Sequence, residues 1–380
     1  MAPRRDRLAV SIITGFLGAG KSTLLNRVLK DPAMNDAAII INEFGEVGID
    51  HLLVTASDDS IIELSDGCLC CTIRGTLVDT LAMIMDTIQT GGMRTLSRVV
   101  VETTGLADPA PVMQSVMGHP VIAESFELEG VVTVVDGVNG LATIERYPEA
   151  LKQVAVADKI VLSKLSMSDG ASVDALRTRL KALNPKALLV DADGEAAGRV
   201  DLFENGLYDP ATKTADVGRW LKDEAAHDHG HRGHHHHDHD HGHHEHDHDH
   251  DINRHGDTIR SYSLMHDRPI DPKALEMFID LLRSTHGEKI LRMKAVVALS
   301  DNPERPLVLH GVQSVFHRPE RLDAWPDPAD RRTRLVLITD GLEEAYVRDL
   351  FDAFVGKPVI DRPDRAALED NPLAVAGFKF

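Results

Sequence analysis

The stretch LAVSIITGFLGAGKSTLLNRVLK, residues 8–30, places an apolar strand, a glycine-rich loop and an amphipathic helix in direct succession. Its central part, GFLGAGKS at residues 15–22, fits the phosphate-loop pattern of a glycine, four residues and then Gly-Lys-Ser. Because the helix begins within the loop, the loop amides and the helix N-terminus would face a polyphosphate. A glycine-rich turn that happens to precede Lys-Ser would not explain the flanking strand and helix. We therefore predict a nucleotide-binding P-loop.

A second strand end supports this prediction. In VVVETTGLADP, residues 99–109, Glu102 directly follows an apolar run and Gly105 comes three residues later. A carboxylate at that place can orient metal or water, and a glycine amide can sense a γ-phosphate. Alone, Glu102 would be the polar end of a strand, but beside a P-loop we expect it to act in nucleotide hydrolysis. Lys21 would reach the β- and γ-phosphates, and Ser22 would hold Mg²⁺.

The residues leave the identity of the nucleotide base open. Guanine-specific enzymes of this class usually carry Asn-Lys-x-Asp after a later strand, whereas this chain has SKLS at residues 163–166. Lys164 can still lay its stem on a purine, but Ser166 cannot accept the guanine hydrogens as strongly as a carboxylate. GTP and ATP both remain candidates on this chemistry. The residues expected to bind nucleotide are Gly15, Gly18, Ala19, Gly20, Lys21, Ser22, Thr23, Gly105, Ser163 and Lys164.

The pattern up to about residue 222 predicts a doubly wound α/β domain. Short, nearly continuous apolar runs alternate with amphipathic stretches such as 22–30 and 172–183. This alternation is expected when helices cover both faces of a mostly parallel sheet. The expected strands are residues 8–13, 37–41, 60–64, 97–101, 130–135, 159–163 and 187–190.

The composition changes abruptly at residues 223–257, which hold 15 of the 21 histidines and almost no apolar residues. Such a segment cannot bury enough surface to offset its ordering entropy, so we predict a disordered linker. Its imidazoles and carboxylates would capture metal without fixed geometry, although a solvated linker with incidental metal binding is the alternative. The pattern of residues 258–380 predicts a smaller α+β domain with an antiparallel sheet. Its expected strands are 259–264, 290–299, 307–317 and 334–339, and its expected helices are 271–284 and 342–354.

All three cysteines of the chain, Cys68, Cys70 and Cys71, lie within four positions. A helix predicted at 77–88 and the nearby Arg74 would lower the thiol pKa values and favour metal-binding thiolates. A closed structural zinc site has four protein ligands, so a site here must borrow a histidine, a carboxylate or water. An incomplete shell suits an ion that has to be released. Buried packing would explain one cysteine but explains three so close together badly.

The loop NEFGEVGID, residues 42–50, is the candidate source of the missing ligand. It follows the second predicted strand, where P-loop switch proteins carry a segment that responds to the γ-phosphate and Mg²⁺. Singly, each of its carboxylates would be a solvated loop residue, but together with the thiols they suggest that nucleotide state completes or breaks a metal shell. The expected metal ligands are Cys68, Cys70, Cys71, Ser22, Glu43 and Asp50, and the expected catalytic residues are Lys21, Glu43 and Glu102.

Charge and hydropathy exclude several classes of partner. The formal net charge of −19 and the lack of a Lys/Arg cluster argue against a nucleic-acid partner. No run of 18 or more apolar residues is present, so we expect no membrane partner. The start, MAPRRDRLAV, lacks the apolar core of a signal peptide, and the crowded cysteines suit a reducing compartment, so we expect a cytoplasmic protein.

At these motifs the chain resembles the CobW-type metallochaperone GTPases, a branch of the P-loop GTPases related to the urease and hydrogenase nickel-insertion GTPases. The resemblance rests on GFLGAGKST, NEFGEVGID, GCLCC, ETTGLADPAP, the histidine-rich stretch and GVQSVFHRPERLDAWP. It implies a GTPase domain at 1–222, a linker at 223–257 and a CobW-like domain at 258–380. It also implies slow GTP hydrolysis, binding of Zn²⁺ or Co²⁺ at the cysteines, and delivery of the ion to a client metalloprotein, in cobalamin biosynthesis or zinc homeostasis.

Two other functions stay open at this point. The first is a metal-buffering protein that binds ions through residues 227–255 and has a vestigial P-loop. The second is a P-loop kinase or ATPase whose thiols hold a structural metal. A dimer that depends on nucleotide or metal is a further expectation, and His119 is the isolated histidine to test as an extra metal ligand.

Overall fold

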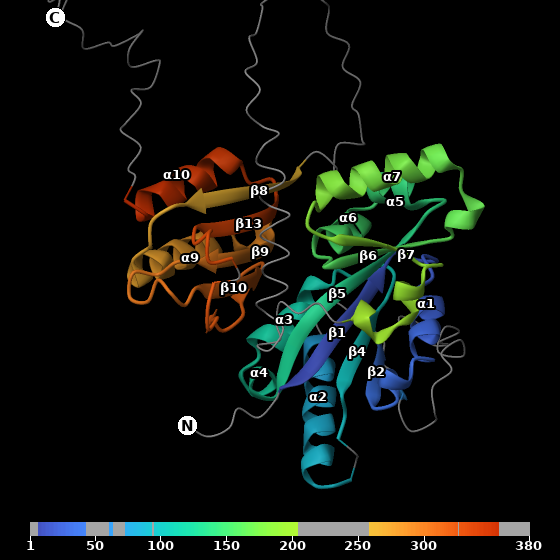
Figure 1. Cartoon of the computed structure of the whole chain (residues 1–380). Coiled ribbons are helices and arrows are strands. Elements are labelled where there is room, and N and C mark those ends of the chain that lie inside the picture. The colour runs from blue at the N-terminus through green and yellow to red at the C-terminus, as the bar shows by residue number, and fades with distance from the viewer. Residues whose placement is uncertain are drawn as a thin grey trace, which may run out of the picture.

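The computed structural model describes residues 7–42, 61–63, 73–92, 95–203, 258–325 and 327–356 (Figure 1). These residues form two units, each built on its own sheet. The predicted combination of a doubly wound α/β domain with a smaller α+β domain is confirmed. The predicted domain boundaries at 222/223 and 257/258 stay predictions, because residues 204–257 lie outside the described residues.

Strand β1 (Leu8–Gly15) lies in the middle of the first sheet, which has the order β3-β2-β4-β1-β5-β6-β7. Every neighbouring pair in this sheet is parallel. Val10, Ile12 and Ile13 are fully buried, which explains why the sequence of β1 is apolar almost throughout. The other strands are β2 (Ala37–Asn42), β3 (Ile61–Glu63), β4 (Arg98–Thr103), β5 (Phe126–Asp136), β6 (Lys159–Ser163) and β7 (Leu188–Asp191).

Helices cover both faces of this sheet (Figure 1). Ile12 packs on one face with Leu81 and Met113, and Ile13 packs on the other face with Leu25. None of the described helices has both the length and the apolar run that crossing a bilayer requires. The helices are α1 (Lys21–Val28), α2 (Ile73–Gln89), α3 (Ala110–Gly118), α4 (Pro120–Ser125), α5 (Gly140–Arg146), α6 (Pro148–Ala155) and α7 (Gly170–Leu183).

The second sheet has the order β11-β10-β9-β13-β8, with β12 paired to β10, and its ladders are antiparallel. Its core contains Phe278 of α9 and Phe351 of α10, whose ring centroids lie 5.3 Å apart. Asp271 caps α9 by accepting hydrogen bonds from two backbone amides of its first turn. The elements are β8 (Ile259–His266), α9 (Pro272–His286), β9 (Ile290–Val297), β10 (Leu307–Val312), β11 (Val315–Phe316), β12 (Glu320–Arg321), β13 (Thr333–Asp340) and α10 (Glu344–Phe354).

The prediction of one continuous strand over 307–317 is wrong. The chain reverses after Val312, so that Val312 pairs with Val315 across a two-residue turn. Gln313 adopts a left-handed conformation with φ of 53°, which glycine or asparagine would signal but glutamine does not. The apolar run therefore forms a hairpin and not a single strand.

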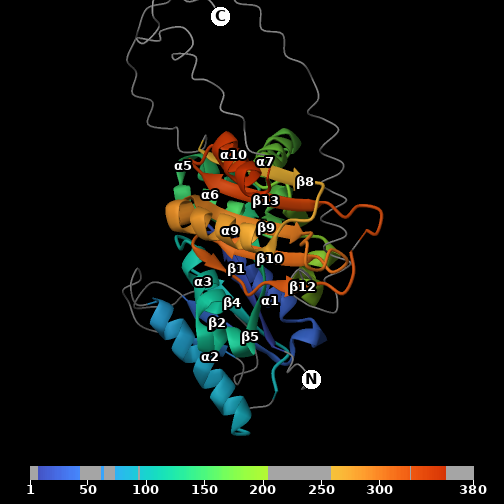
Figure 2. The ribbon, with the colours of Figure 1, turned by 90° about the vertical axis from the view of Figure 1, so that its left-hand side faces the viewer.

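The two units meet along α3, α6, α7 and the start of β5. In the view of Figure 2 the C-terminal unit lies in front of the first unit. The carboxylate of Asp158 lies 2.6 Å from Arg292 and 2.5 Å from Lys294 of β9. Burial alone would raise the pKa of Asp158, but the two cations outweigh it and hold that pKa well below its usual range. Burial lowers the pKa of Lys294 to about 8 although Asp158 opposes the change. A buried ion cluster thus joins the two units.

Replacing Asp158 by Asn should lower the free energy of unfolding by about 3–5 kcal/mol, because two cations would stay buried without their countercharge. Since the folded-state pKa of Asp158 is depressed, its contribution is present above roughly pH 4 and disappears as the pH falls through the folded-state value. Urea unfolding at several pH values measures both effects. The exposed Asp174→Asn variant is the control, and equal stabilities of the two variants would contradict the prediction.

Candidate functional site

Residues 15–22 join β1 to α1 and take a backbone conformation that depends on glycine. Gly15, Gly18 and Gly20 have φ values of 143°, 72° and 96°, a region that side chains disfavour. A Cβ on Gly15 would lie 2.3 Å from the carbonyl oxygen of Val134 in β5, so no side chain fits there. Gly20 precedes the first residue of α1 as its N-cap. The loop amides at the start of a helix form the anion-binding arrangement that the sequence predicts.

Lys21 folds back over this loop. Its ammonium nitrogen lies 3.0 Å from the carbonyl oxygen of Gly15 and 3.4 Å from that of Phe16. The cation is therefore held at the loop by two neutral oxygens. Phosphate oxygens, which carry charge, form stronger hydrogen bonds and can replace these carbonyls.

Ser22 and Glu102 meet although they lie 80 residues apart in the sequence. The Ser22 hydroxyl donates to the Glu102 carboxylate over 3.1 Å, and the two residues are only 9% and 5% exposed. Glu102 is in β4, paired in register with Ile13 of β1, so neighbouring parallel strands bring the two side chains together. A hydroxyl beside a carboxylate offers the hard oxygen ligands that Mg²⁺ prefers, and the pair therefore fits that ion.

The segment 104–109 leads from β4 to α3 and packs tightly against the P-loop. A Cβ on Gly105 would lie 2.6 Å from the backbone nitrogen of Leu17, so only glycine allows this approach. Gln153 of α6 donates to the carbonyl oxygens of Gly105, at 3.2 Å, and Ala107, at 3.0 Å. The segment is thus held between the loop and α6.

Ser163 and Lys164 approach the P-loop from the end of β6. The Ser163 hydroxyl donates to the Ala19 carbonyl over 2.6 Å. The Lys164 ammonium donates to the Gly18 carbonyl over 2.8 Å and to the carboxylate of Asp136 over 2.7 Å. Lys164 itself has a φ of 56°, a strained value for a lysine. The lysine stem therefore lies across the loop, where it can pack on a nucleotide base.

Asp136 was missed by the sequence reasoning. Burial would raise its pKa, but the hydrogen bond from Lys164 and two backbone amides outweigh burial and hold the pKa below its usual value. The available signal was its position, because Asp136 ends β5 beside β6 in the parallel sheet. A carboxylate at that edge is placed to orient the lysine that follows β6.

The remaining predicted site residues divide into two groups. Thr23 lies exposed in the first turn of α1, and Ser166 lies exposed two residues after Lys164. His119 lies between α3 and α4, half-buried. The predictions for Glu43, Asp50, Cys68, Cys70, Cys71 and the histidine-rich stretch 223–257 fall outside the described residues.

The chain is similar to known proteins over both units. Residues 9–191 match the family described as CobW/HypB/UreG, nucleotide-binding domain, and residues 259–355 match the cobalamin synthesis protein cobW C-terminal domain. The zinc chaperone YjiA of Escherichia coli K12 is 30% identical over 354 residues, covering 90% of this chain and 98% of that protein. The zinc chaperone CobW of Pseudomonas aeruginosa is 32% identical over 376 residues, covering 90% of each chain. The crystal structure of Zn(II)-bound YjiA GTPase has the same fold, with a TM-score of 0.62 and 24% identity over 92% of this chain and 99% of that chain.

Replacing Lys21 by Ala should reduce nucleoside triphosphate hydrolysis by at least about 100-fold, because no other described side chain carries a cation to the same place on the loop. Steady-state phosphate release measures the effect. Lys30→Ala is the matched control, since Lys30 lies exposed beyond the other end of α1. Hydrolysis that survives in the Lys21 variant would remove this loop from the reaction.

Proposed function

Because the chain belongs to the CobW family of P-loop GTPases, we propose that it is a GTP-dependent metallochaperone that carries Zn²⁺ on Cys68, Cys70 and Cys71 to a client metalloprotein. Zn²⁺ is favoured over Co²⁺ because the similar proteins are named zinc chaperones, whereas thiolates would accept either ion. The observation that carries the proposal is the contact between Ser22 of the P-loop and Glu102 of β4, the strand that leads into the segment 104–109.

Nucleotide binding would act first on the charged residues of the loop. Lys21 would exchange the carbonyl oxygens of Gly15 and Phe16 for phosphate oxygens. The amide of Gly105, a residue that packs closely against Leu17, would sense the terminal phosphate. Ser22 and Glu102 would hold Mg²⁺, which when bound neutralises the charge that develops on the phosphates. Glu102, together with Glu43, orients the attacking water. The roles of Ser22 and Glu102 require only small movements, because these two residues already meet.

A change at the phosphates has a direct path to the second unit. Asp108 accepts a hydrogen bond from the amide of Ala110 over 2.9 Å and so fixes the start of α3 to the segment 104–109. Along α3, Gln114 donates to Gln313 of the β10–β11 turn over 2.7 Å. A Cβ on Gly118 would lie 2.7 Å from Val315 of β11, so α3 touches the hairpin closely at its end as well. A shift of α3 must therefore be accommodated by the C-terminal unit.

The topology supports a cysteine site at the carboxyl edge of the sheet, where the P-loop also lies. In the parallel sheet, the chain leaves β3 at the carboxyl edge and must start α2 there in order to return to β4. Cys71 precedes the first residue of α2 by two positions, a reach of at most about 7 Å. Residue 43 follows β2, whose last residue pairs with Thr103 beside Glu102. Nucleotide and thiolates would thus share one edge.

The intact loop argues against a metal-buffering protein with a vestigial P-loop. The strained glycines, the position of Lys21 and the Ser22–Glu102 contact would serve no purpose in metal storage. We propose GTP rather than ATP because of the family, with Lys164 packing on the guanine. The client would act in zinc homeostasis or cobalamin biosynthesis, and a dimer dependent on nucleotide or metal would bring two carriers together.

A thiolate site predicts a specific spectrum. Co²⁺ added to the full chain should give sulfur-to-cobalt charge-transfer absorption, which the imidazoles and carboxylates of residues 223–257 cannot produce. Serine at Cys68, Cys70 and Cys71 together should abolish this band and leave GTP hydrolysis within about twofold of the original rate. A wild-type chain without the band would overturn the proposed carrier site.

Competition between nucleotides tests whether the site prefers guanine to adenine. GTP should displace a fluorescent guanine nucleotide at least roughly tenfold better than ATP does, because the pocket is expected to read the purine edge as well as the phosphates. Lys164→Ala should weaken binding of both. Equal displacement by ATP and GTP would instead favour an ATPase.

A further inference from the structure

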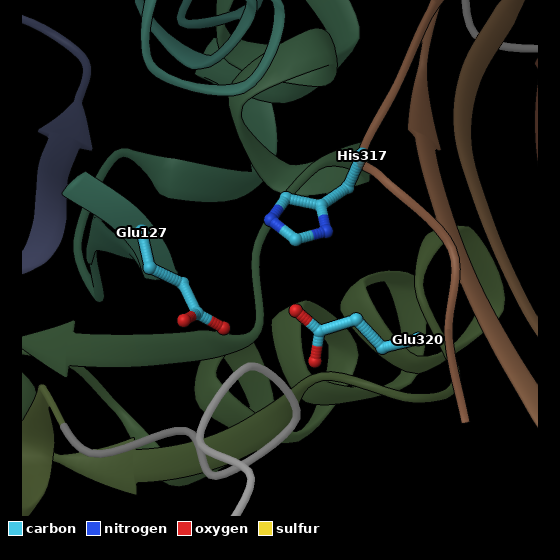
Figure 3. Close-up of side chains that lie close together, drawn as sticks. All are labelled: Glu127, His317 and Glu320. Atoms are coloured by element: carbon cyan, nitrogen blue, oxygen red, sulfur yellow. The ribbon is translucent and has the colours of Figure 1, made fainter. Parts of the chain in front are cut away.

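Three ionisable side chains converge where the two units meet, far in the sequence from the cysteines. Glu127 comes from β5 of the first sheet, Glu320 from β12 of the second sheet, and His317 from the connection between β11 and β12. One ligand atom from each lies within 4.8 Å of the other two. Figure 3 shows the imidazole and both carboxylates facing a common space. Among the described residues, none from the P-loop takes part in this cluster.

The cluster is well shielded from water. His317 is 6% exposed, and the side chains of Glu127 and Glu320 are 10% and 9% exposed. Two carboxylates that are buried so close together repel each other unless a positive charge lies between or beside them. The fold therefore needs a cation at this place.

The imidazole of His317 is oriented as in a metal ligand. Its Nδ1 lies 2.9 Å from the carbonyl oxygen of Arg318, which can only accept, so Nδ1 carries a hydrogen and donates it. The other ring nitrogen, Nε2, is then the one that can offer a lone pair. A backbone carbonyl on Nδ1 is the usual way in which proteins fix the tautomer of a ligating histidine. The backbone amide of His317 also donates to the carbonyl of His310 over 2.9 Å, which anchors the loop.

Arg7 supplies the positive charge in the structure described. Its guanidinium lies 2.6 Å from Glu320 and 3.6 Å from Glu127. The simplest role of the cluster is therefore an ion-paired clasp between the units. Arg7 comes before β1 and keeps 18% of its side chain exposed, so it can leave the carboxylates without disturbing the sheet.

We propose that Glu127, His317 and Glu320 form a second Zn²⁺ site, at which the ion competes with Arg7 for the two carboxylates. One imidazole and two carboxylates, with water in the fourth position, form a donor set that Zn²⁺ accepts and that Mg²⁺ does not favour. Ligands of a tetrahedral zinc ion lie roughly 3.4 Å apart, so side chains whose ligand atoms lie within 4.8 Å need only small rotations.

Such a site would respond to metal supply by joining the two units. Zn²⁺ bound by Glu127 of the first unit and by His317 and Glu320 of the second unit would clamp β5 to the C-terminal unit. The site goes beyond the proposed carrier function, because it needs neither the cysteines nor the nucleotide.

Zinc binding can be measured without the thiolates. The full chain with serine at Cys68, Cys70 and Cys71 is equilibrated with Zn²⁺ at a free concentration fixed by a chelator, and the bound metal is counted. His317→Ala should remove one equivalent and weaken that class of site by more than about 100-fold. Glu320→Gln should also remove this equivalent of zinc, although glutamine has nearly the same shape as glutamate. His286→Ala, at the end of α9, should leave the count unchanged.

The Arg7→Ala variant should change zinc affinity in the opposite direction. Removing the competing guanidinium should tighten the site by on the order of tenfold. Anomalous diffraction at the zinc edge should then place an ion between Glu127, His317 and Glu320. Unchanged zinc counts in the His317, Glu320 and Arg7 variants, with no anomalous peak at this place, would reduce the cluster to an ion-paired clasp. Because all these chains lack the cysteines, that result would leave the carrier proposal standing.

Discussion

The hydrogen bond between Ser22 and Glu102 is the contact on which the nucleotide edge of this protein depends. It joins the first turn of α1, the helix that follows β1, to the end of β4, the strand that pairs with β1 in the parallel sheet. Both residues are buried, so the carboxylate interacts with its neighbours through a medium that screens charge less than water does. The same strand continues into the segment 104–109, which touches the P-loop at Leu17 and carries α3. We propose that the same few contacts set the position of a bound phosphate and the position of α3.

The C-terminal unit is attached to that machinery by apolar and by polar contacts. Ile259, Leu291 and Ile338 belong to the same buried apolar cluster as the inner face of α7. Asp158 pairs with Arg292 and Lys294, and Gln114 pairs with Gln313. Burying ions costs free energy that an apolar interface would not, so such clusters contribute more to defining one arrangement than to raw stability. Gln114 lies on α3 and Gln313 on the β10–β11 turn, so a shift of α3 would reach the second unit through this pair.

The sequence predicts the parallel sheet and the P-loop because both depend on local signals. Buried parallel strands must be apolar almost throughout, and the loop needs its glycines and lysine in fixed order, so β1 and residues 15–22 could be identified directly. Asp136 could not be identified from such local signals, because its role depends on Lys164, which reaches it from the end of the neighbouring strand. The β10–β11 hairpin was hidden because Gln313 takes a left-handed conformation without a glycine to mark it. Likewise, nothing local pairs Glu127 with His317, since only the docking of the two units brings them together. The cysteine motif and the loop 43–50 lie outside the described residues and stay predictions.

We propose that nucleotide state and metal affinity are coupled through the shared edge of the sheet. The most direct test is a competition titration of Zn²⁺ against a chromophoric chelator, with the chain bound to a non-hydrolysable GTP analogue and, separately, to GDP. The account predicts dissociation constants for the cysteine-dependent ion that differ by at least about fivefold between the two states. It further predicts that the difference shrinks when Glu102 is replaced by Gln. Identical constants in both nucleotide states would contradict the account, because a carrier whose affinity ignores its nucleotide has no means of releasing its cargo on hydrolysis.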